Sequence, residues 1–147
     1  MSAEWPKMVR SMLPDPAEAA IVPTVGSQEN MLGARVPPHP RADVHPDADG
    51  NVGPRGEGLS VAPSLAALPQ GLVPERLRDK RPGARGSNSL RVFRLGDGSF
   101  SRSAVGDSLE LAPTSSKHGV LQPKRPMTLG DYQGHLAATK TRWVDEG

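Results

Sequence analysis

The chain contains no cysteine, which excludes disulfides, thiolate metal sites and a cysteine nucleophile. Aromatic residues are nearly as scarce, with 2 Trp, 1 Tyr and 2 Phe among 147 residues, so a packed domain must bury most of its Leu, Val and Ala. No run approaches the roughly 20 apolar residues of a membrane span, and the first residues lack the apolar segment of a signal peptide. We therefore expect a protein that is cytoplasmic in the producing cell and that reaches any target cell without a cleaved signal.

Proline and glycine, by contrast, are abundant, with 16 of each. Proline removes backbone donors and biases its neighbours toward extended or turn conformations. The segment 22–55 is especially rich in both residues, and we expect it to be an ordered loop region with one or two short strands. The chain length fits one small, loop-rich domain.

The positive charge lies mostly in the second half of the chain. The net charge is +2, but residues 1–70 are net acidic and residues 71–147 are net basic. A basic cluster could dock an acidic protein or nucleic acid, or it could be an ordinary solvated surface. Phe93 is the one aromatic residue near it, which argues against single-strand nucleic acid. The cluster comprises Arg76, Arg78, Lys80, Arg81, Arg85, Arg91 and Arg94.

Local patterns predict mostly short elements. Helical segments are expected at 15–22, where Asp15 is the N-cap, and at 63–68 and 74–80. Strands are expected at 58–62, 108–111 and 119–122, and a hairpin is expected to pair 90–95 with 99–101 across Gly96-Asp97-Gly98.

The clearest predicted helix is the last one. Thr128 is its expected N-cap, with Asp131 three residues further on. Helical spacing places Leu129, Tyr132, Leu136 and Trp143 on one apolar face.

Familiar site motifs are absent. Asp47, Asp49 and Asn51 around Gly50 could suggest calcium, but the spacing does not fit an EF-hand and a turn is the favoured interpretation. The four histidines form no helical ligand pair, so no metal site is predicted. A Walker A loop, a GxGxxG motif and a Gly-x-Ser-x-Gly elbow are also missing.

Two blocks of sequence together resemble the ADP-ribosyltransferase-like toxin effectors of the bacterial type VI secretion system. The first runs from Asp49-Gly50-Asn51 through Pro54 to Gly58-Leu59-Ser60-Val61. The second is His118-Gly119-Val120-Leu121-Gln122-Pro123 with Pro126-Met127, followed by Gly134-His135-Leu136. The first 35 residues match poorly and are expected to be partly disordered, whereas 36–147 would be the ADP-ribosyltransferase-like domain.

The resemblance implies an α+β fold in which a split, mostly antiparallel β-sheet holds NAD as substrate in a cleft, with a C-terminal helix. It also implies transfer of ADP-ribose to an unknown acceptor and a cognate immunity protein. By residue-wise transfer, Ser60 and His118 are the expected catalytic residues, with Ser60 also contacting NAD. The first-strand residue that grips NAD is either Arg10 or Arg41, because the strand expected around Arg10 is not evident in the sequence.

No glutamate occupies an obvious catalytic position, and Glu57 and Glu110 are the candidates. The alternative function is therefore a non-enzymatic interaction protein that binds an acidic partner or nucleic acid through its basic half.

Overall fold

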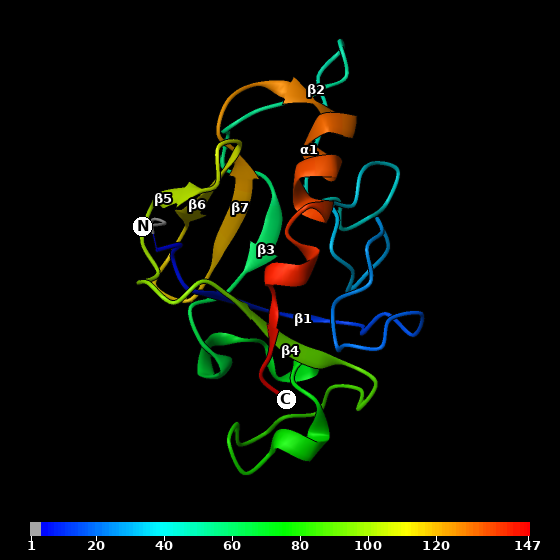
Figure 1. Ribbon diagram of the computed structural model, residues 1–147, viewed down its shortest axis with the longest axis vertical. Coiled ribbons are helices and arrows are strands. Elements are labelled where there is room, and N and C mark those ends of the chain that lie inside the picture. Colours follow the sequence, from blue (N-terminus) through cyan, green and yellow to red (C-terminus); the bar gives the residue numbers. More distant parts are fainter. Residues whose placement is uncertain (1–3) are drawn as a thin grey trace.

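Antiparallel strands in three small sheets build the protein, with one α-helix near the C-terminus (Figure 1). The computed structural model describes residues 4–147. The strands are β1 (Met8–Met12), β2 (Asn51–Val52), β3 (Leu59–Val61), β4 (Arg91–Leu95), β5 (Ser103–Val105), β6 (Leu109–Pro113), β7 (Gly119–Pro123), β8 (Met127–Thr128) and β9 (Val144–Asp145). The helix is α1 (Leu129–Ala137), and four 3-10 turns are η1 (Leu65–Ala67), η2 (Gln70–Leu72), η3 (Glu75–Leu77) and η4 (Lys140–Arg142).

The predicted fold class is confirmed: the chain is α+β, loop-rich and mostly antiparallel, and its sheet is split. One part has the order β1-β4-β9 and the other β3-β7-β6-β5, while β2 pairs with β8 alone. The two larger parts are joined by a β-bridge, in which Val9 and Ala62 exchange both backbone hydrogen bonds at 2.8 and 2.9 Å. In Figure 1, β1 and β4 accordingly cross beneath β3 and β7.

β1 is a strand that the sequence pattern did not reveal, and all five of its residues are buried. Met8 and Met12 face the main core, while Val9 belongs to a second apolar cluster on the opposite face. Continuous burial on both faces hides the polar/apolar alternation that marks a half-buried strand. The N-terminal segment therefore supplies a strand of the sheet, and residues 1–3 of the part expected to be disordered lie outside the described residues.

The predicted hairpin between 90–95 and 99–101 is wrong. β4 forms as expected, but its neighbours are β1 and β9. Gly96 has a φ of 75°, and a Cβ there would lie 2.1 Å from the carbonyl oxygen of Pro6, so the chain turns against the segment before β1. The local hairpin is instead β5 with β6, while the strands predicted at 58–62, 108–111 and 119–122 are present as β3, β6 and β7.

The predicted helix at 15–22 is also wrong. Asp15 Oδ1 accepts from Ala17 N at 2.9 Å in a local turn, and Lys140 Nζ binds Asp15 Oδ2 at 2.7 Å. The segments 63–68 and 74–80 form single 3-10 turns, because Pro69, Pro74 and Pro82 leave too little chain for an α-helix. Among the described residues, no helix is long and apolar enough to span a membrane.

α1 forms as predicted and is hydrogen-bonded to the four-stranded part of the sheet. Thr128 Oγ1 accepts from Asp131 N at 3.1 Å, which confirms the N-cap. The buried Tyr132 hydroxyl accepts from Leu59 N at 3.1 Å and donates to the Leu121 carbonyl, joining α1 to β3 and β7. Trp143 is buried but lies beyond the helix, where its indole Nε1 donates to Thr139 Oγ1 at 2.9 Å.

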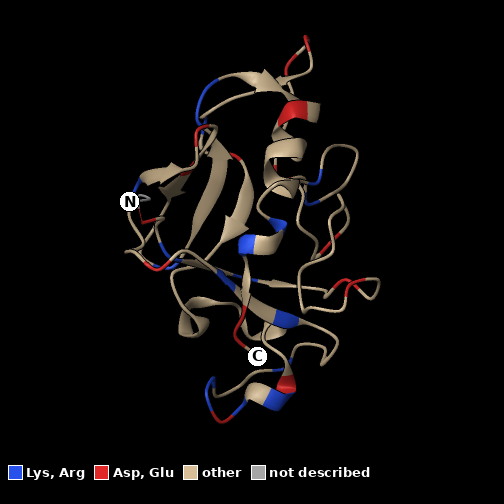
Figure 2. Ribbon diagram, viewed as in Figure 1, with Lys and Arg blue, Asp and Glu red and all other residues tan. Residues whose placement is uncertain are grey.

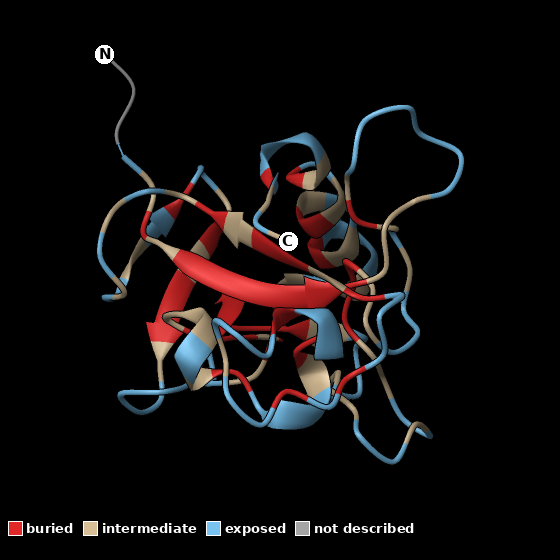
Figure 3. Ribbon diagram, turned by 90° about the horizontal axis from the view of Figure 1, so that it is seen from below, coloured by how far each residue is buried: buried red, intermediate tan, exposed pale blue. Residues whose placement is uncertain are grey.

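Burial follows most of the strands, and most of the exposed residues lie in loops, although loop residues such as Leu32 and Val73 are also buried (Figure 3). The main core fills the space between the two larger sheet parts and α1. The second cluster lies under β1 and β4 and comprises Val9, Ala62, Leu68, Val73, Leu77, Ala84 and Val92. The η1–η3 turns close this cluster, and η1 and η2 also border the cavity described next.

Candidate active site

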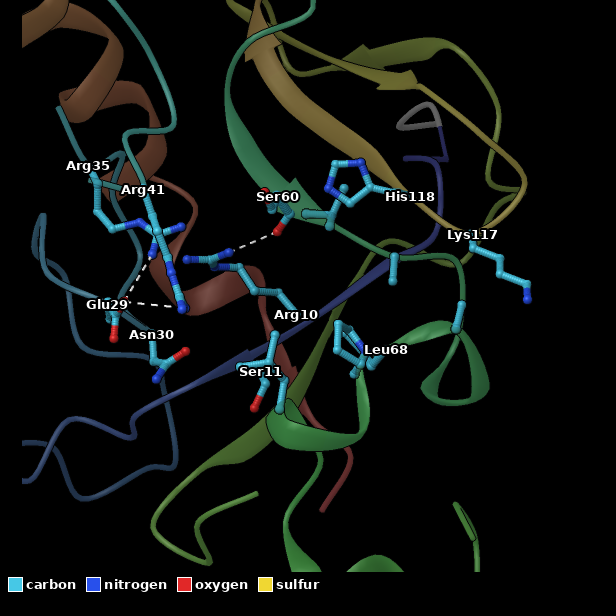
Figure 4. Close-up of a pocket in the computed structure, with 15 residues that line it drawn as sticks. Arg10, Ser11, Glu29, Asn30, Arg35, Arg41, Ser60, Leu68, Lys117 and His118 are labelled. Carbon is cyan, nitrogen blue, oxygen red and sulfur yellow. Dashed lines mark hydrogen bonds and ion pairs between the residues drawn. The ribbon is translucent and has the colours of Figure 1, made fainter. Parts of the chain in front are cut away.

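A cavity of about 410 Å³ opens where β1, β3 and the start of β7 meet the loop segment 29–41 (Figure 4). The four residues that the family resemblance implied as catalytic or NAD-binding all line it: Arg10, Arg41, Ser60 and His118. Its volume is within the range of small-molecule sites. Residues from four distant stretches of chain therefore converge on one hollow.

Arg10 is the most deeply buried charge in the cavity wall. On β1 it shares the inward face of Met8 and Met12, and only 8% of the residue is exposed. Its Nη1 donates to the Ser60 carbonyl at 2.8 Å and its Nη2 to the Met31 carbonyl at 3.1 Å. Arg10 thereby ties the two halves of the split sheet to the loop that follows β1.

The positive charge of Arg10 has no carboxylate partner among the described residues, and its Nε is buried without a hydrogen bond. Burial lowers the pKa of Arg10 to about 10; nearby Asp43 raises it and Arg35 lowers it. The guanidinium therefore stays charged at neutral pH. A buried, unneutralised cation is unfavourable in a folded protein and favours an anionic ligand in the adjoining cavity.

Arg35 is held differently, by a two-pronged contact with Asp43. Nε and Nη2 of Arg35 each lie 3.1 Å from an oxygen of that carboxylate, and Arg35 N donates to it at 2.8 Å. The hydrogen bond to Asp43 raises the pKa of Arg35. Gln133 on α1 fixes the preceding residue, because its amide accepts from Ala34 N at 2.8 Å and donates to Ala34 O at 2.7 Å.

Glu29 is a cavity residue that sequence reasoning missed. Its Oε1 lies 3.6 Å from Nη1 of Arg35 and 3.8 Å from Nη1 of Arg41, as the dashed lines in Figure 4 indicate. Glu29 is an isolated acid in a polar loop, so no spacing in the sequence connects it to Ser60. Only the packing of that loop against β1 brings it to the cavity.

The two glutamates that the sequence offered as candidates lie elsewhere. Glu57 pairs with His45, with Oε2 2.6 Å from Nδ1, and Glu110 contacts Arg102 and Gln122. Neither lines the cavity. Glu29 is the one carboxylate among its described lining residues.

The pairing of β3 with β7 explains why Ser60 and His118 lie together. Ser60 is opposite Val120 and Val61 is opposite Gly119, so continuing the register places His118 beside Ala62, on the same face as Ser60. Gly119 begins the buried strand, while His118 remains exposed at the cavity. Figure 4 shows the His118 ring next to Ser60.

The cavity has a polar, cationic side and an apolar side. Lys117 adds a further cation to Arg10, Arg35 and Arg41. The apolar wall is formed by Ala62, Ala67, Leu68, Pro69 and Leu72. The Ser11 hydroxyl, which also borders the cavity, is buried and has no hydrogen-bond partner within residues 4–147. Such a site suits a ligand that carries both phosphate and ring systems.

The described residues contain no cluster of side chains that could bind a metal ion. Among residues 4–147 no group of three His, Asp or Glu side chains is arranged to hold a metal ion. Asp47 Oδ1 instead accepts from Asp49 N and Asn51 N at 2.9 and 3.0 Å, so this acidic stretch forms a turn.

Much of the basic segment 76–85 supports its own loop. Arg76, Arg78 and Arg81 donate to the carbonyls of Leu90, Ala84 and Leu68 at 2.6, 2.7 and 3.2 Å. Acidic side chains are interspersed with the basic ones at this end of the molecule (Figure 2). These arginines satisfy backbone carbonyls of the loop-rich segment 68–90.

Comparison with known proteins identifies the family. The chain matches the sequence profile of the Tse2 ADP-ribosyltransferase toxin over residues 20–145. No curated protein and no solved structure matches the chain significantly. The matched segment covers most of the chain and includes Ser60, Arg41 and His118, so this protein belongs to the Tse2 ADP-ribosyltransferase toxin family and is a transferase enzyme of that class.

Proposed function

We propose that the protein is a toxin that transfers ADP-ribose from NAD to an acceptor in a target cell, and that the cavity beside Arg10 is its active site. The observation that carries the proposal is Arg10, a buried cation without a carboxylate partner, next to Ser60 and His118. ADP-ribosyltransferases as a class use NAD, whose pyrophosphate is dianionic. The unneutralised charge of Arg10 matches that group.

Each residue then has a defined role. Arg10 and Arg41 contact the pyrophosphate, while Arg35 is largely neutralised by Asp43. Ser60 lies between the cations and the apolar wall, where its hydroxyl can orient the nicotinamide end of NAD. Glu29 can hydrogen-bond a ribose hydroxyl, and His118 can accept the proton that the acceptor loses.

The bound dinucleotide supplies a good leaving group, because nicotinamide departs as a neutral ring. The protein must stabilise the positive charge that develops on the ribose, and preorganised polar groups in a partly dry cavity can do so without a metal. Delivery by a type VI secretion system and neutralisation by an immunity protein in the producer complete the proposal. Both rest on the family rather than on the cavity.

The test is nicotinamide release from NAD by the purified protein, with and without target-cell extract. We expect turnover by the parent chain and a loss of about 100-fold or more in kcat for His118→Ala. Ser60→Ala should likewise remove most of the activity, whereas Arg10→Met should chiefly raise KM for NAD. His135→Ala on α1 and Ser99→Ala on the surface are matched controls outside the cavity and should keep parental activity.

Two results would contradict the proposal. If the folded parent protein does not turn over NAD, the proposed NAD-dependent reaction is wrong. If His118→Ala and Ser60→Ala both keep full activity, the assignment of the active site is wrong. In cells, expression of the parent should stop growth and expression of Ser60→Ala should not.

A further inference from the structure

We infer that Thr114 is a positioning residue that sets the tautomer and ring orientation of His118, so that the Nε2 lone pair faces the cavity. The inference rests on the proposed function only for the chemistry that Nε2 performs. The contacts that carry it lie in the loop between β6 and β7, which brings Thr114, itself outside the cavity lining, against the lining residue His118.

Four contacts join the two ends of this loop. Thr114 N donates to the His118 carbonyl at 2.9 Å, and Ser115 N donates to the same oxygen at 3.0 Å. The Thr114 hydroxyl lies 3.1 Å from that carbonyl oxygen and 2.8 Å from Nδ1 of the His118 ring. The side chain of Thr114 therefore touches both the backbone and the ring of one residue.

A count of protons favours one direction for these contacts. A hydroxyl has one proton to donate, and a carbonyl oxygen can only accept. If the hydroxyl donates to the carbonyl, the contact at 2.8 Å must be Nδ1–H donating to the hydroxyl oxygen. In this arrangement each of the two contacts of the Thr114 hydroxyl, to the carbonyl oxygen and to Nδ1, is a hydrogen bond with a proton between the two atoms.

The neutral ring then has its second nitrogen free as an acceptor. With the proton on Nδ1, the lone pair is on Nε2, and the hydrogen bond made by one nitrogen decides the state of the other. In Figure 4 the His118 ring extends from the start of β7 toward Ser60, at the cavity. Without the Thr114 contact, an exposed ring would be free to rotate and to exchange tautomers.

Nε2 in this state can act as a general base in the transfer step. The acceptor O–H or N–H gives its proton to Nε2, and the electron pair left on the acceptor forms the new bond to C1′ of the ribose. The electron pair of the breaking C1′–N bond goes to the nicotinamide ring, which leaves uncharged. The opposite tautomer would direct an N–H at the acceptor and could not take its proton.

The charged groups around the ring are mainly cationic. Lys117 is adjacent in the chain, and Arg10, Arg35 and Arg41 line the same cavity, with Glu29 beside the last two. No carboxylate contacts His118 among the described residues. The Thr114 hydroxyl therefore orients the His118 ring, a task that an aspartate or glutamate performs for many catalytic histidines.

The direct test is nitrogen-15 NMR of the imidazole at about pH 8.5, where an ordinary histidine of pKa about 6.5 is neutral. In the parent protein we expect a pyrrole-type shift for Nδ1 and a pyridine-type shift for Nε2 of His118. In Thr114→Val the two shifts should move toward the average of a mixture of tautomers. Predominantly Nε2–H imidazole in the parent, or unchanged shifts in Thr114→Val, would overturn the inference.

The kinetic test uses isosteric and conservative variants. Thr114→Val should lower kcat by about 10-fold or more while KM for NAD stays within about twofold, because the cavity cations are untouched. Thr114→Ser should restore kcat. Ser116→Ala, in the same loop, is the matched control and should behave as the parent. Equal kcat in Thr114→Val and the parent would also overturn the inference.

The two proposals can fail separately. An inactive parent with the expected nitrogen shifts would contradict the proposed reaction and leave the role of Thr114 supported. An active parent with the Nε2–H tautomer would support the proposed reaction and contradict the role of Thr114.

Discussion

At the scale of single residues, buried polar side chains join strands both within and between the two halves of the split sheet. Arg10 reaches from β1 to the Ser60 carbonyl, and the Tyr132 hydroxyl bridges β3 and β7. Each side chain satisfies backbone groups where the sheet does not. Helical spacing places Tyr132 on an apolar face, but nothing in the sequence marks the hydroxyl of Tyr132 or the guanidinium of Arg10 as a bridge between strands.

Tyr132→Phe should show how much such a bridge contributes. The change removes only the hydroxyl and leaves buried Leu59 N without that partner, so we expect the free energy of unfolding to fall by about 1–3 kcal/mol. Urea unfolding followed by circular dichroism measures it. Ser99→Ala, which removes an exposed hydroxyl, should change stability by less than about 0.5 kcal/mol. If Tyr132→Phe and Ser99→Ala lower the free energy of unfolding by the same small amount, the Tyr132 bridge does not contribute to stability.

At the scale of elements, the C-terminal strand depends on ion pairs as well as on pairing. β9 pairs with β4 through only two residues. Arg91 donates from Nε to Asp145 Oδ1 at 2.9 Å and from Nη2 to Asp145 Oδ2 at 2.6 Å. The hydrogen bond to Arg91 lowers the pKa of Asp145 below its usual value. Protonation of Asp145 should therefore loosen β9.

The pH dependence follows from the direction of that shift. A carboxyl group whose pKa is lowered by folding stabilises the protein above its unfolded pKa of about 3.9, and the contribution is lost as pH falls through and below that value. We expect Asp145→Asn to cost about 1 kcal/mol at pH 7 and almost nothing at pH 2. Urea titrations at both pH values measure the difference.

Arg91→Met removes the other partner and serves as the control for this pair. It should lower stability over the same pH range, and the double variant should be little worse than either single one. Additive losses would mean that the two side chains act independently.

Local sequence rules predicted the elements whose signals are local. The N-cap at Thr128 and the strands around Ser60 and Val120 have such signals, and the structure confirms them. The helix at 15–22 failed because Asp15 binds a residue 125 positions away, and the hairpin at 90–101 failed because β4 pairs with β1. In both cases a distant partner outcompeted the local pattern.

At the scale of the whole molecule, the family match and the fold do not begin at the same residue. The match covers 20–145, whereas β1 (Met8–Met12) lies between β4 and β3 and is entirely buried. β1 also carries Arg10 into the cavity. The boundary predicted at residue 35 remains a prediction about the family domain, but the fold uses residues before it.

A chain that starts at residue 20 should therefore fail to fold. Without β1, the main core loses Met8 and Met12 and the second cluster loses Val9. In the full chain, Met12→Ala should cost about 2–5 kcal/mol, whereas Ile21→Ala, at an exposed position, should cost less than about 0.5 kcal/mol. Circular dichroism and urea unfolding of the three proteins test this. Cooperative unfolding of the truncated chain would contradict a structural role for β1.

The sequence by itself determined the class of the protein: no thiol chemistry, a loop-rich α+β chain, a capped final helix, and two blocks that pointed to Ser60, His118 and an arginine on an early segment. Only the tertiary structure decided which groups meet. It placed Arg10 on a buried strand, brought Arg41 and Glu29 to the same cavity, left Glu57 and Glu110 outside it, and set Thr114 against His118. The reason is physical: caps, turns and strand propensity act between neighbours in the chain, whereas a cavity is made by strand pairing and ion contacts between residues far apart in sequence.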